Sequence, residues 1–210
     1  MLYVLTGKSS SGKDTLQNGL LALNDCTADE KYADEKYQVL VSTTSRPMRE
    51  GEQEGREYYF TSNEGFKKKI SEGYFLEYRE YHTLVENKPA TWYYGLGKSV
   101  PNKEIAKPGS KYITILDLYG ANECIKYYGK ENCKVIYLSA PDDIREERAK
   151  KRGSFDKTEW DRRLKDDDIK FSEDKLKEIV NIRFANIYDK ETLISCMDEM
   201  FTNFSHNCQN

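Results

Sequence analysis

Short apolar runs alternate with longer amphipathic stretches along this chain. The runs predict buried strands, and stretches whose apolar residues recur three or four positions apart predict helices. A helix over 15–23 follows from Leu16, Leu20 and Leu23, which lie at i, i+4 and i+7. The same pattern predicts strands at 2–6, 38–42, 111–117, 134–140 and 178–185, and later helices at 119–128, 141–152, 159–177 and 189–204.

This alternation predicts an α/β fold built on a mostly parallel, doubly wound sheet with right-handed crossovers. Ligands of such sheets bind at the carboxyl ends of the strands. Residues 43–97 interrupt the alternation, since they are rich in Tyr, Glu and Gly and too long for a crossover loop. We expect an inserted subdomain there, with short strands at 56–60 and 74–78 around a helix near 63–72.

Composition narrows the class of protein. With 210 residues and 33% charged side chains, the chain is typical of one soluble domain, and its net charge of −3 gives no general attraction to nucleic acid or an acidic membrane. No apolar run approaches the ~20 residues of a membrane span. The five cysteines are widely spaced without a C-x-x-C pair, so we expect reduced thiols and a cytoplasmic location. The sequence does not indicate an oligomeric state.

The stretch GKSSSGKDT at 7–15 follows a predicted strand and precedes a predicted helix. Gly7 and Gly12 allow the backbone to turn its N–H groups toward phosphate oxygens, and Lys13 adds a positive charge. The helix that follows offers its positive N-terminus. A phosphate-binding loop is therefore predicted; a plain serine–glycine turn is the alternative.

The segment STTSRPMREGE at 42–52 is a second candidate anion site, in which Arg46 and Arg49 flank a Pro–Met step. Two guanidinium groups three residues apart on a constrained turn can bind one phosphate from two sides. A pair of exposed loop arginines is the alternative, and this segment alone does not decide between the two.

Five of the ten arginines lie between 145 and 163. Arg145, Arg148 and Arg152 are spaced to share one helix face, and Arg162 and Arg163 begin the next helix after a glycine-containing break. A solvated helix face is one interpretation. Beside a phosphate-binding loop we favour the other, a helix–loop–helix lid whose arginines close over a transferring phosphoryl group.

Asp117 ends the predicted strand YITILD. At the carboxyl edge of a parallel strand, its carboxylate could hold Mg²⁺ through water or accept a hydrogen bond from a substrate. Capping the helix that follows is a second role compatible with the first.

The segments GKSSSGKDT, STTSRPMREGEQEGREYYF, FLEY, WYYG, ILDLYGA and a lid with RAKKRG and RRL together resemble guanylate kinase over nearly the whole chain. The resemblance implies a P-loop nucleoside-monophosphate kinase fold, with a core at 1–42, 98–140 and 178–210, a GMP-binding subdomain at 43–97 and a lid at 141–177. It implies a transferase of purine nucleotide metabolism that converts ATP and GMP, or dGMP, into ADP and the diphosphate with Mg²⁺.

The resemblance also implies individual roles. ATP would be bound by Gly7, Ser9, Ser10, Ser11, Gly12, Lys13, Asp14, Thr15, Arg148, Arg152 and Asn186. GMP would be bound by Ser42, Arg46, Arg49, Tyr58, Glu77, Tyr94 and Asp117. Catalytic charge neutralisation would come from Lys13, Arg46, Arg148, Arg152 and Arg163, with Asp14 and Asp117 near the metal. No general base is required, because the attacking phosphate is already ionised.

Three positions depart from the family pattern. Leu96 stands where the family has Thr or Ser near the guanine, which removes a polar contact. Residues 82–92 are longer than the usual connection, and we expect a spacer loop; packing of Trp92 on the subdomain is the alternative. Asp14 stands where many P-loops have a hydroxyl; it either favours the helix N-terminus or contacts Mg²⁺ through water. A doubled pentapeptide, ADEKYADEKY at 28–37, is expected to be a solvated loop or helix extension.

Two other functions stay open at this stage. One is a catalytically inactive guanylate-kinase-like module that binds protein, although such modules typically lack an intact phosphate-binding loop. The other is a nucleoside-monophosphate kinase with a shifted base preference, which Leu96 motivates. Glu77 favours guanine, because guanine presents a ring N–H and an amine side by side and adenine does not.

Overall fold

The computed structural model describes residues 1–24, 36–85, 88–151, 155–186 and 189–206. The chain divides into two compact units, one formed by Met1–Gln38 with Lys103–Asn210 and the other by Val39–Asn102. We call them the sheet unit and the inserted unit and describe each by itself.

The sheet unit contains a five-stranded sheet in the order β2-β7-β1-β8-β9. Its strands are β1 (Leu2–Thr6), β2 (Tyr37–Val39), β7 (Lys111–Ile115), β8 (Cys133–Ser139) and β9 (Ile182–Ala185). Strand β1 pairs in parallel with both β7 and β8, and β8 pairs in parallel with β9. Every residue of β1 is buried, because the strand lies at the centre of the sheet. The predicted α/β fold with a mostly parallel sheet is confirmed.

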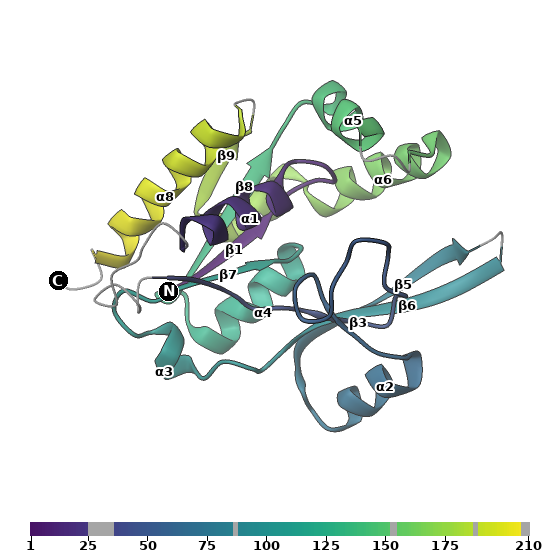
Figure 1. The fold of residues 1–210 in the computed structure, drawn as a ribbon, viewed down its shortest axis with the longest axis horizontal. Helices are drawn as coiled ribbons and strands as arrows, with labels where there is room; N and C mark the ends of the chain where they lie inside the picture. Colours follow the sequence, from purple (N-terminus) through teal and green to yellow (C-terminus); the bar gives the residue numbers. More distant parts are fainter. Residues whose placement is uncertain (25–35, 86–87, 152–154, 187–188, 207–210) are drawn as a thin grey trace. The chain divides into compact units, whose positions relative to one another are not determined.

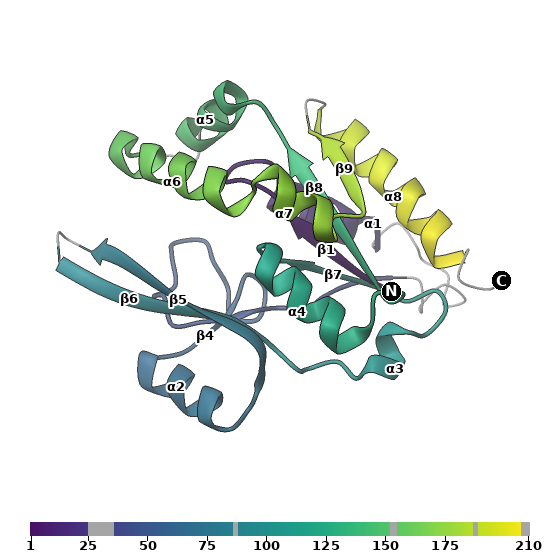
Figure 2. The same cartoon turned by 180° about the vertical axis from the view of Figure 1, so that it is seen from behind.

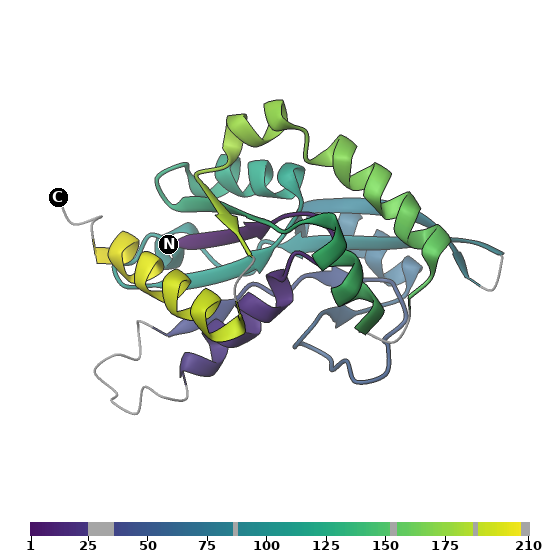
Figure 3. The same ribbon diagram turned by 90° about the horizontal axis from the view of Figure 1, so that it is seen from above.

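Helices cover both faces of this sheet. Helices α1 (Lys13–Leu23) and α8 (Lys190–His206) lie on one face, and α4 (Leu118–Tyr128) and α7 (Glu173–Ile179) lie on the other (Figure 1 and Figure 2). Seen from above, α1 and α8 cross side by side, in purple and yellow (Figure 3). The core between them and the sheet therefore joins the two ends of the chain.

Tyr3 connects β1 to the C-terminal helix. Its ring stacks on Phe201 with 4.0 Å between ring centroids, and its hydroxyl donates a hydrogen bond of 2.8 Å to the Phe201 carbonyl oxygen. Both side chains are fully buried. A buried tyrosine hydroxyl needs such a partner, so this contact also fixes the position of α8.

The inserted unit contains a four-stranded sheet in the order β4-β3-β6-β5 and one helix. Its elements are β3 (Thr43–Thr44), β4 (Tyr59–Phe60), α2 (Asn63–Ser71), β5 (Phe75–Val85) and β6 (Lys88–Gly97). Ser62 caps α2 by accepting a hydrogen bond from the Gly65 N–H. Phe66 of this helix stacks against Phe75 and Tyr93 and forms the small core of the unit.

The structure corrects several predicted boundaries. Strand β2 ends at Val39, and the two-residue β3 follows instead of one strand over 38–42. The helix predicted over 159–177 is two helices, α6 (Lys157–Lys170) and α7, because Phe171 leaves the helical pattern to pack with Leu118 and Tyr137. A short helix α3 (Asn102–Ile105) and helix α5 (Asp142–Lys151) complete the fold.

Residues 82–85 and 88–92 do not form the expected spacer loop. They belong to strands β5 and β6, in which Tyr81 lies opposite Trp92 and His82 opposite Thr91. Most of the doubled pentapeptide lies outside the described residues.

Across the described parts of the chain, none of the helices combines the length and apolar content that crossing a bilayer requires.

Replacing Tyr3 by Phe tests the connection between β1 and α8. The substitution removes one buried hydrogen bond and keeps the ring stack, so we expect a loss of about 1 kcal/mol in the free energy of unfolding. Urea denaturation measures it, with Tyr59→Phe as the matched control, because the Tyr59 ring is 44% exposed. Equal stability of the two variants would contradict the assignment.

Candidate functional site

The loop between β1 and α1 has a backbone that only glycine permits at two positions. Gly7 has φ +149° and Gly12 has φ +99°. A Cβ atom at Gly7 would lie 2.3 Å from the Leu138 carbonyl oxygen, and one at Gly12 would lie 2.1 Å from Asn186 Nδ2. Both glycines are therefore required by backbone conformation and by space.

Side chains hold the carbonyl groups of this loop. Lys13 Nζ donates hydrogen bonds of 2.8 Å to the Gly7 oxygen and 3.0 Å to the Lys8 oxygen. Asn186 Nδ2 donates one of 2.7 Å to the Ser11 oxygen. The loop is thereby held in one conformation before any ligand binds, which lowers the cost of ordering it.

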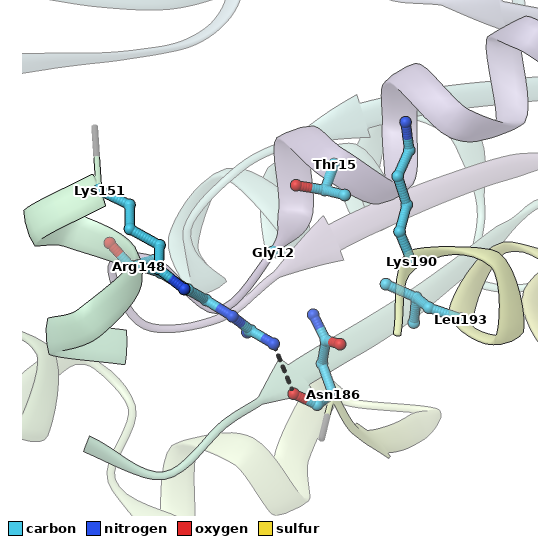
Figure 4. A pocket seen from close by; sticks show the side chains of 8 residues that line it. Gly12, Thr15, Arg148, Lys151, Asn186, Lys190 and Leu193 are labelled. Atoms are coloured by element: carbon cyan, nitrogen blue, oxygen red, sulfur yellow. Dashed lines mark hydrogen bonds between the residues drawn. The ribbon is translucent and has the colours of Figure 1, made fainter. Parts of the chain in front are cut away.

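A cavity of about 330 Å³ lies beside the loop (Figure 4). Three cationic side chains, those of Arg148, Lys151 and Lys190, line it together with Asn186, and Arg148 Nη2 donates to the Asn186 carbonyl oxygen at 3.1 Å. The remaining lining residues are Ser10, Gly12, Thr15 and Leu193. Cations and a glycine loop around one cavity suit an anionic ligand that also carries a less polar part.

The candidate metal residues lie in two places of the sheet unit. Asp14 is exposed in the first turn of α1, next to Thr15 at the cavity. Asp117 caps α4, since its Oδ1 accepts a hydrogen bond of 2.9 Å from the Gly120 N–H, and it borders a second cavity of about 290 Å³. Within the described ranges, no three His, Cys, Asp or Glu side chains are grouped to hold a metal ion.

The predicted row of lid arginines separates in the structure. Arg145 is buried against protein groups, whereas Arg148 reaches the cavity. Arg163 of α6 bonds to Glu159 at 2.7 Å on its own helix. Arg152 lies outside the described residues. Of the arginines described, only Arg148 is among the residues that line this cavity.

Glu159 accepts hydrogen bonds from two arginines of α6. Its carboxylate binds Arg162, and it also binds Arg163. The Arg162 hydrogen bond is the main cause that lowers the pKa of Glu159 to about 2. Both arginine side chains are therefore oriented by one carboxylate that stays ionised.

Arg46 is the centre of the candidate anion site in the inserted unit. Its side chain is only 4% exposed, and its Nη2 forms an ion pair of 2.7 Å with Glu52. Burial opposes the charge of Arg46, but Glu52 outweighs it and raises the guanidinium pKa. The other Glu52 oxygen accepts the Arg49 N–H at 2.8 Å, so one carboxylate holds both arginine positions.

Two tyrosines complete this group. The Arg46 guanidinium lies 5.6 Å from the Tyr58 ring centroid, and the Tyr58 and Tyr94 centroids are 5.8 Å apart. Burial raises the pKa of Tyr94 above its ordinary value, although Arg46 opposes this. Tyr94 therefore keeps its hydroxyl proton at neutral pH and can donate a hydrogen bond.

Glu77 lies on β5 opposite Leu96 of β6. Its Oε1 accepts a hydrogen bond of 3.1 Å from the Leu96 N–H, and its side chain is buried. The Leu96 side chain is fully buried, so this residue contributes its main chain to the site. Ser42 lies just before β3, and its carbonyl oxygen accepts the Tyr59 N–H at 2.9 Å.

Sequence reasoning did not find three carboxylates that pair with arginines, one in the inserted unit and two in the sheet unit. Glu52 lies only six residues after Arg46, and this spacing in a turn was the available signal. Glu159 and Asp167 lie in strongly charged helical stretches, where sequence does not distinguish a partner from a solvated side chain.

Comparison with known proteins identifies the family. A family model described as guanylate kinase matches residues 1–90. The guanylate kinase of Latilactobacillus sakei is 31% identical over 192 residues, which cover 89% of this chain and 83% of that protein. The chain belongs to the guanylate kinase family. A second member, the guanylate kinase of Porphyromonas gingivalis, is 30% identical, with 95% of this chain and 93% of that protein covered.

The fold is shared with a solved member of the family. The crystal structure of guanylate kinase from Anaplasma phagocytophilum matches with a TM-score of 0.63 over 97% of this chain and 85% of that chain, at 22% sequence identity. The guanylate kinase fold of this chain therefore persists where most of the sequence has changed.

Replacing Gly12 by Ala should impair the phosphate loop. The new Cβ would force φ +99° on an L residue and displace Asn186 from the loop, so we expect ATP affinity to fall at least about tenfold. Isothermal titration with ATP measures it. Gly73→Ala is the control, because its φ of +67° carries similar strain but its Cβ would meet nothing within 4 Å. Unchanged ATP affinity in Gly12→Ala would contradict this role.

Glu159 should make stability depend on acidic pH. Its folded pKa of about 2 lies below the unfolded value near 4.5, so its contribution is present above about pH 5 and is lost as pH falls toward 2. Because the side chain is 37% exposed, solvent screening limits this to about 1 kcal/mol. Glu159→Gln should therefore differ from the parent at pH 7 and progressively less below pH 4.5 in urea denaturation. A difference independent of pH would contradict the assignment.

Proposed function

We propose that this chain transfers the terminal phosphoryl group of ATP to GMP, giving ADP and GDP. The observation that carries the proposal is that one member of the guanylate kinase family has two separate groups of cationic side chains whose geometry suits phosphate. One is the glycine loop with its cavity, and the other is the Arg46 group with its two tyrosines. A kinase that transfers a phosphoryl group from one nucleotide to another needs one such group for each nucleotide.

The donor side is assigned to the sheet unit. The N–H groups of Ser10, Ser11 and Gly12 and the ammonium group of Lys13 would bind the ATP phosphates. The Ser11 N–H would leave the Lys8 carbonyl oxygen, to which it now donates at 3.2 Å. Lys13 would exchange its present carbonyl partners for phosphate oxygens, which attract an ammonium group more strongly. The cavity lined by Arg148 and Asn186 would take the rest of the nucleotide, and Ser9 and Thr15 flank it.

The acceptor side is assigned to the inserted unit. Arg46 and Arg49 would bind the phosphate of GMP, and the hydroxyls of Tyr58 and Tyr94 would donate to it. Glu52 contributes by holding both arginine positions, as an unpaired buried guanidinium would be costly.

Recognition of the base is assigned to Glu77, with Ser42 and Asp117 as further contacts. Guanine presents two adjacent N–H donors, which match the acceptor oxygens of a carboxylate. The Leu96 N–H orients this carboxylate, so a hydroxyl at position 96 is not needed for that task. AMP would leave the buried Glu77 without donors and should bind poorly.

The chemistry is in-line phosphoryl transfer without a general base, because the attacking GMP oxygen is already ionised. The protein contributes position and positive charge, from Lys13, Arg46, Arg148, Arg152 and Arg163. Mg²⁺, when bound with ATP, supplies further charge neutralisation. The donors present fit such an ion: Asp14 and Thr15 offer oxygens beside the loop, and hydrated Mg²⁺ takes its other ligands from phosphates and water.

The proposal includes an organisation and a location. Residues 43–97 would form the GMP-binding subdomain, 141–177 the lid, and the remaining segments the core. Lid closure would exclude water, which otherwise hydrolyses ATP. A reducing cytoplasm suits Cys124, Cys133 and Cys196, which form no disulfide and of which the last is exposed.

A substrate panel tests the function. We expect kcat/KM with ATP to be higher by orders of magnitude for GMP and dGMP than for AMP and UMP, measured by coupled ADP release. Glu77→Gln replaces one acceptor oxygen by a donor and should reduce the preference for GMP over AMP by about 10- to 100-fold.

Two results would overturn parts of this proposal. Absence of ADP formation with every monophosphate would favour an inactive interaction module. Comparable rates for AMP or UMP would establish a shifted base preference. Glu80→Gln is the matched control for Glu77→Gln, since Glu80 lies on the same strand and its side chain is 49% exposed; this variant should keep the parent preference.

A further inference from the structure

An ion pair holds the phosphate loop at Ser9. Asp167 Oδ2 of α6 accepts a hydrogen bond of 2.7 Å from the Ser9 N–H. Arg145 Nη1 of α5 donates one of 3.0 Å to the Ser9 carbonyl oxygen. The two side chains are themselves 3.4 Å apart. The peptide groups on both sides of the Ser9 Cα are therefore fixed by one Arg–Asp pair.

This pair is buried inside the sheet unit. The Arg145 side chain is 0% exposed and that of Asp167 11%. Arg145 also bonds to Asp142 at 2.6 Å, and its guanidinium lies 5.6 Å from the Trp160 ring centroid. Burying two charges costs much of what their attraction contributes, so stability alone is a weak explanation for such a pair.

The residue after Ser9 shows why the loop needs this contact. Ser10 has φ +60°, and among the described residues it is the non-glycine with a left-handed backbone. Such a conformation persists only when the surroundings impose it. With Ser9 held by Arg145 and Asp167, and the Ser11 carbonyl held by Asn186, Ser10 is fixed from both sides.

Charge balance matters at the same place. A lone carboxylate beside the loop would repel the ATP phosphates, and Arg145 offsets that charge. The pair thus offers Ser9 an acceptor and a donor, and its own two charges offset each other. The second carboxylate bound to Arg145, that of Asp142, is 66% exposed to solvent. The partners come from α5 and α6, the helices that also carry Arg148 and Arg163.

We propose that Arg145 and Asp167 are positioning residues for the donor nucleotide: they hold Ser9, and through it Ser10, in the conformation that binds the ATP phosphates. This inference rests on the donor half of the proposed function. The two residues act through the loop and do not touch the reacting atoms.

The double variant Arg145→Met/Asp167→Ala tests the proposal, because it removes both charges together and leaves no unpaired buried ion. We expect the Kd and KM for ATP to rise about tenfold or more, since the loop must then be ordered on binding. The KM for GMP and kcat at saturating ATP should stay within about twofold, as the chemistry itself is unchanged. In the absence of nucleotide, hydrogen exchange of the Ser9 amide, measured by NMR, should be faster in the double variant than in the parent.

The control removes an Arg–carboxylate pair elsewhere in the same unit. Arg183→Gln/Glu173→Gln breaks an exposed pair of 2.7 Å and should leave the Kd for ATP and the Ser9 exchange rate unchanged. Two single variants add a charge test. Arg145→Met leaves the carboxylate uncompensated and should weaken ATP binding more than the isosteric Asp167→Asn, which keeps an acceptor oxygen for the Ser9 N–H.

Several outcomes would overturn the proposal. If the double variant has the same ATP affinity and the same Ser9 amide exchange rate as the parent, the pair only fills space. An equal rise in both KM values would show general loosening. If the double variant does not fold, the single variants decide. The proposal is then wrong if Asp167→Asn binds ATP with the parent affinity and Arg145→Met binds ATP no more weakly than Asp167→Asn does. ATP binding and amide exchange can be measured without turnover. A failure of the proposed GMP phosphorylation can therefore be told apart from a failure of the positioning role of Arg145 and Asp167.

Discussion

Four carbonyl groups of the loop between β1 and α1 accept hydrogen bonds from side chains of three other places in the chain. Lys13 holds two of them, Arg145 of α5 holds a third, and Asn186 after β9 holds a fourth. The loop itself follows the central, fully buried strand of the sheet. Its conformation is therefore imposed by the packed unit, and every element of the donor side depends on that packing.

Carboxylates pair with several arginines in the described parts of the chain. Arg46 is held by Glu52, Arg163 by Glu159, and Arg145 by Asp142 and Asp167. With a net charge of −3, the chain has no general attraction for anions. Local pairing orients individual arginines, and only their placement makes a region of the surface attractive to phosphate.

Much of the fold follows from the order of apolar runs. The central strand and the amphipathic helix that follows it flank the glycine loop, so the position of the loop could be read from residues 2–23. Residues 43–97 also stand out in the sequence, because they break the alternation of strands and helices. The β5–β6 hairpin was missed, since a stretch with charges, a proline and an asparagine looks like a loop when the partner strand is unknown. Phe171 was likewise read as part of one helix, because its burial against Tyr137 depends on distant packing.

By itself the sequence determined the strand–loop–helix order, the required glycines and the positions of the basic residues, because backbone sterics and hydrophobic periodicity are local properties. Only the tertiary structure decided which arginine lines the cavity and which forms an ion pair with a buried carboxylate. Arg145 and Arg148 are three residues apart on one helix, yet the first is enclosed by Asp142, Asp167 and Trp160 and the second lines the cavity. That difference arises from groups brought together over long sequence separations, such as Ser9 with Asp167, and no local pattern contains it.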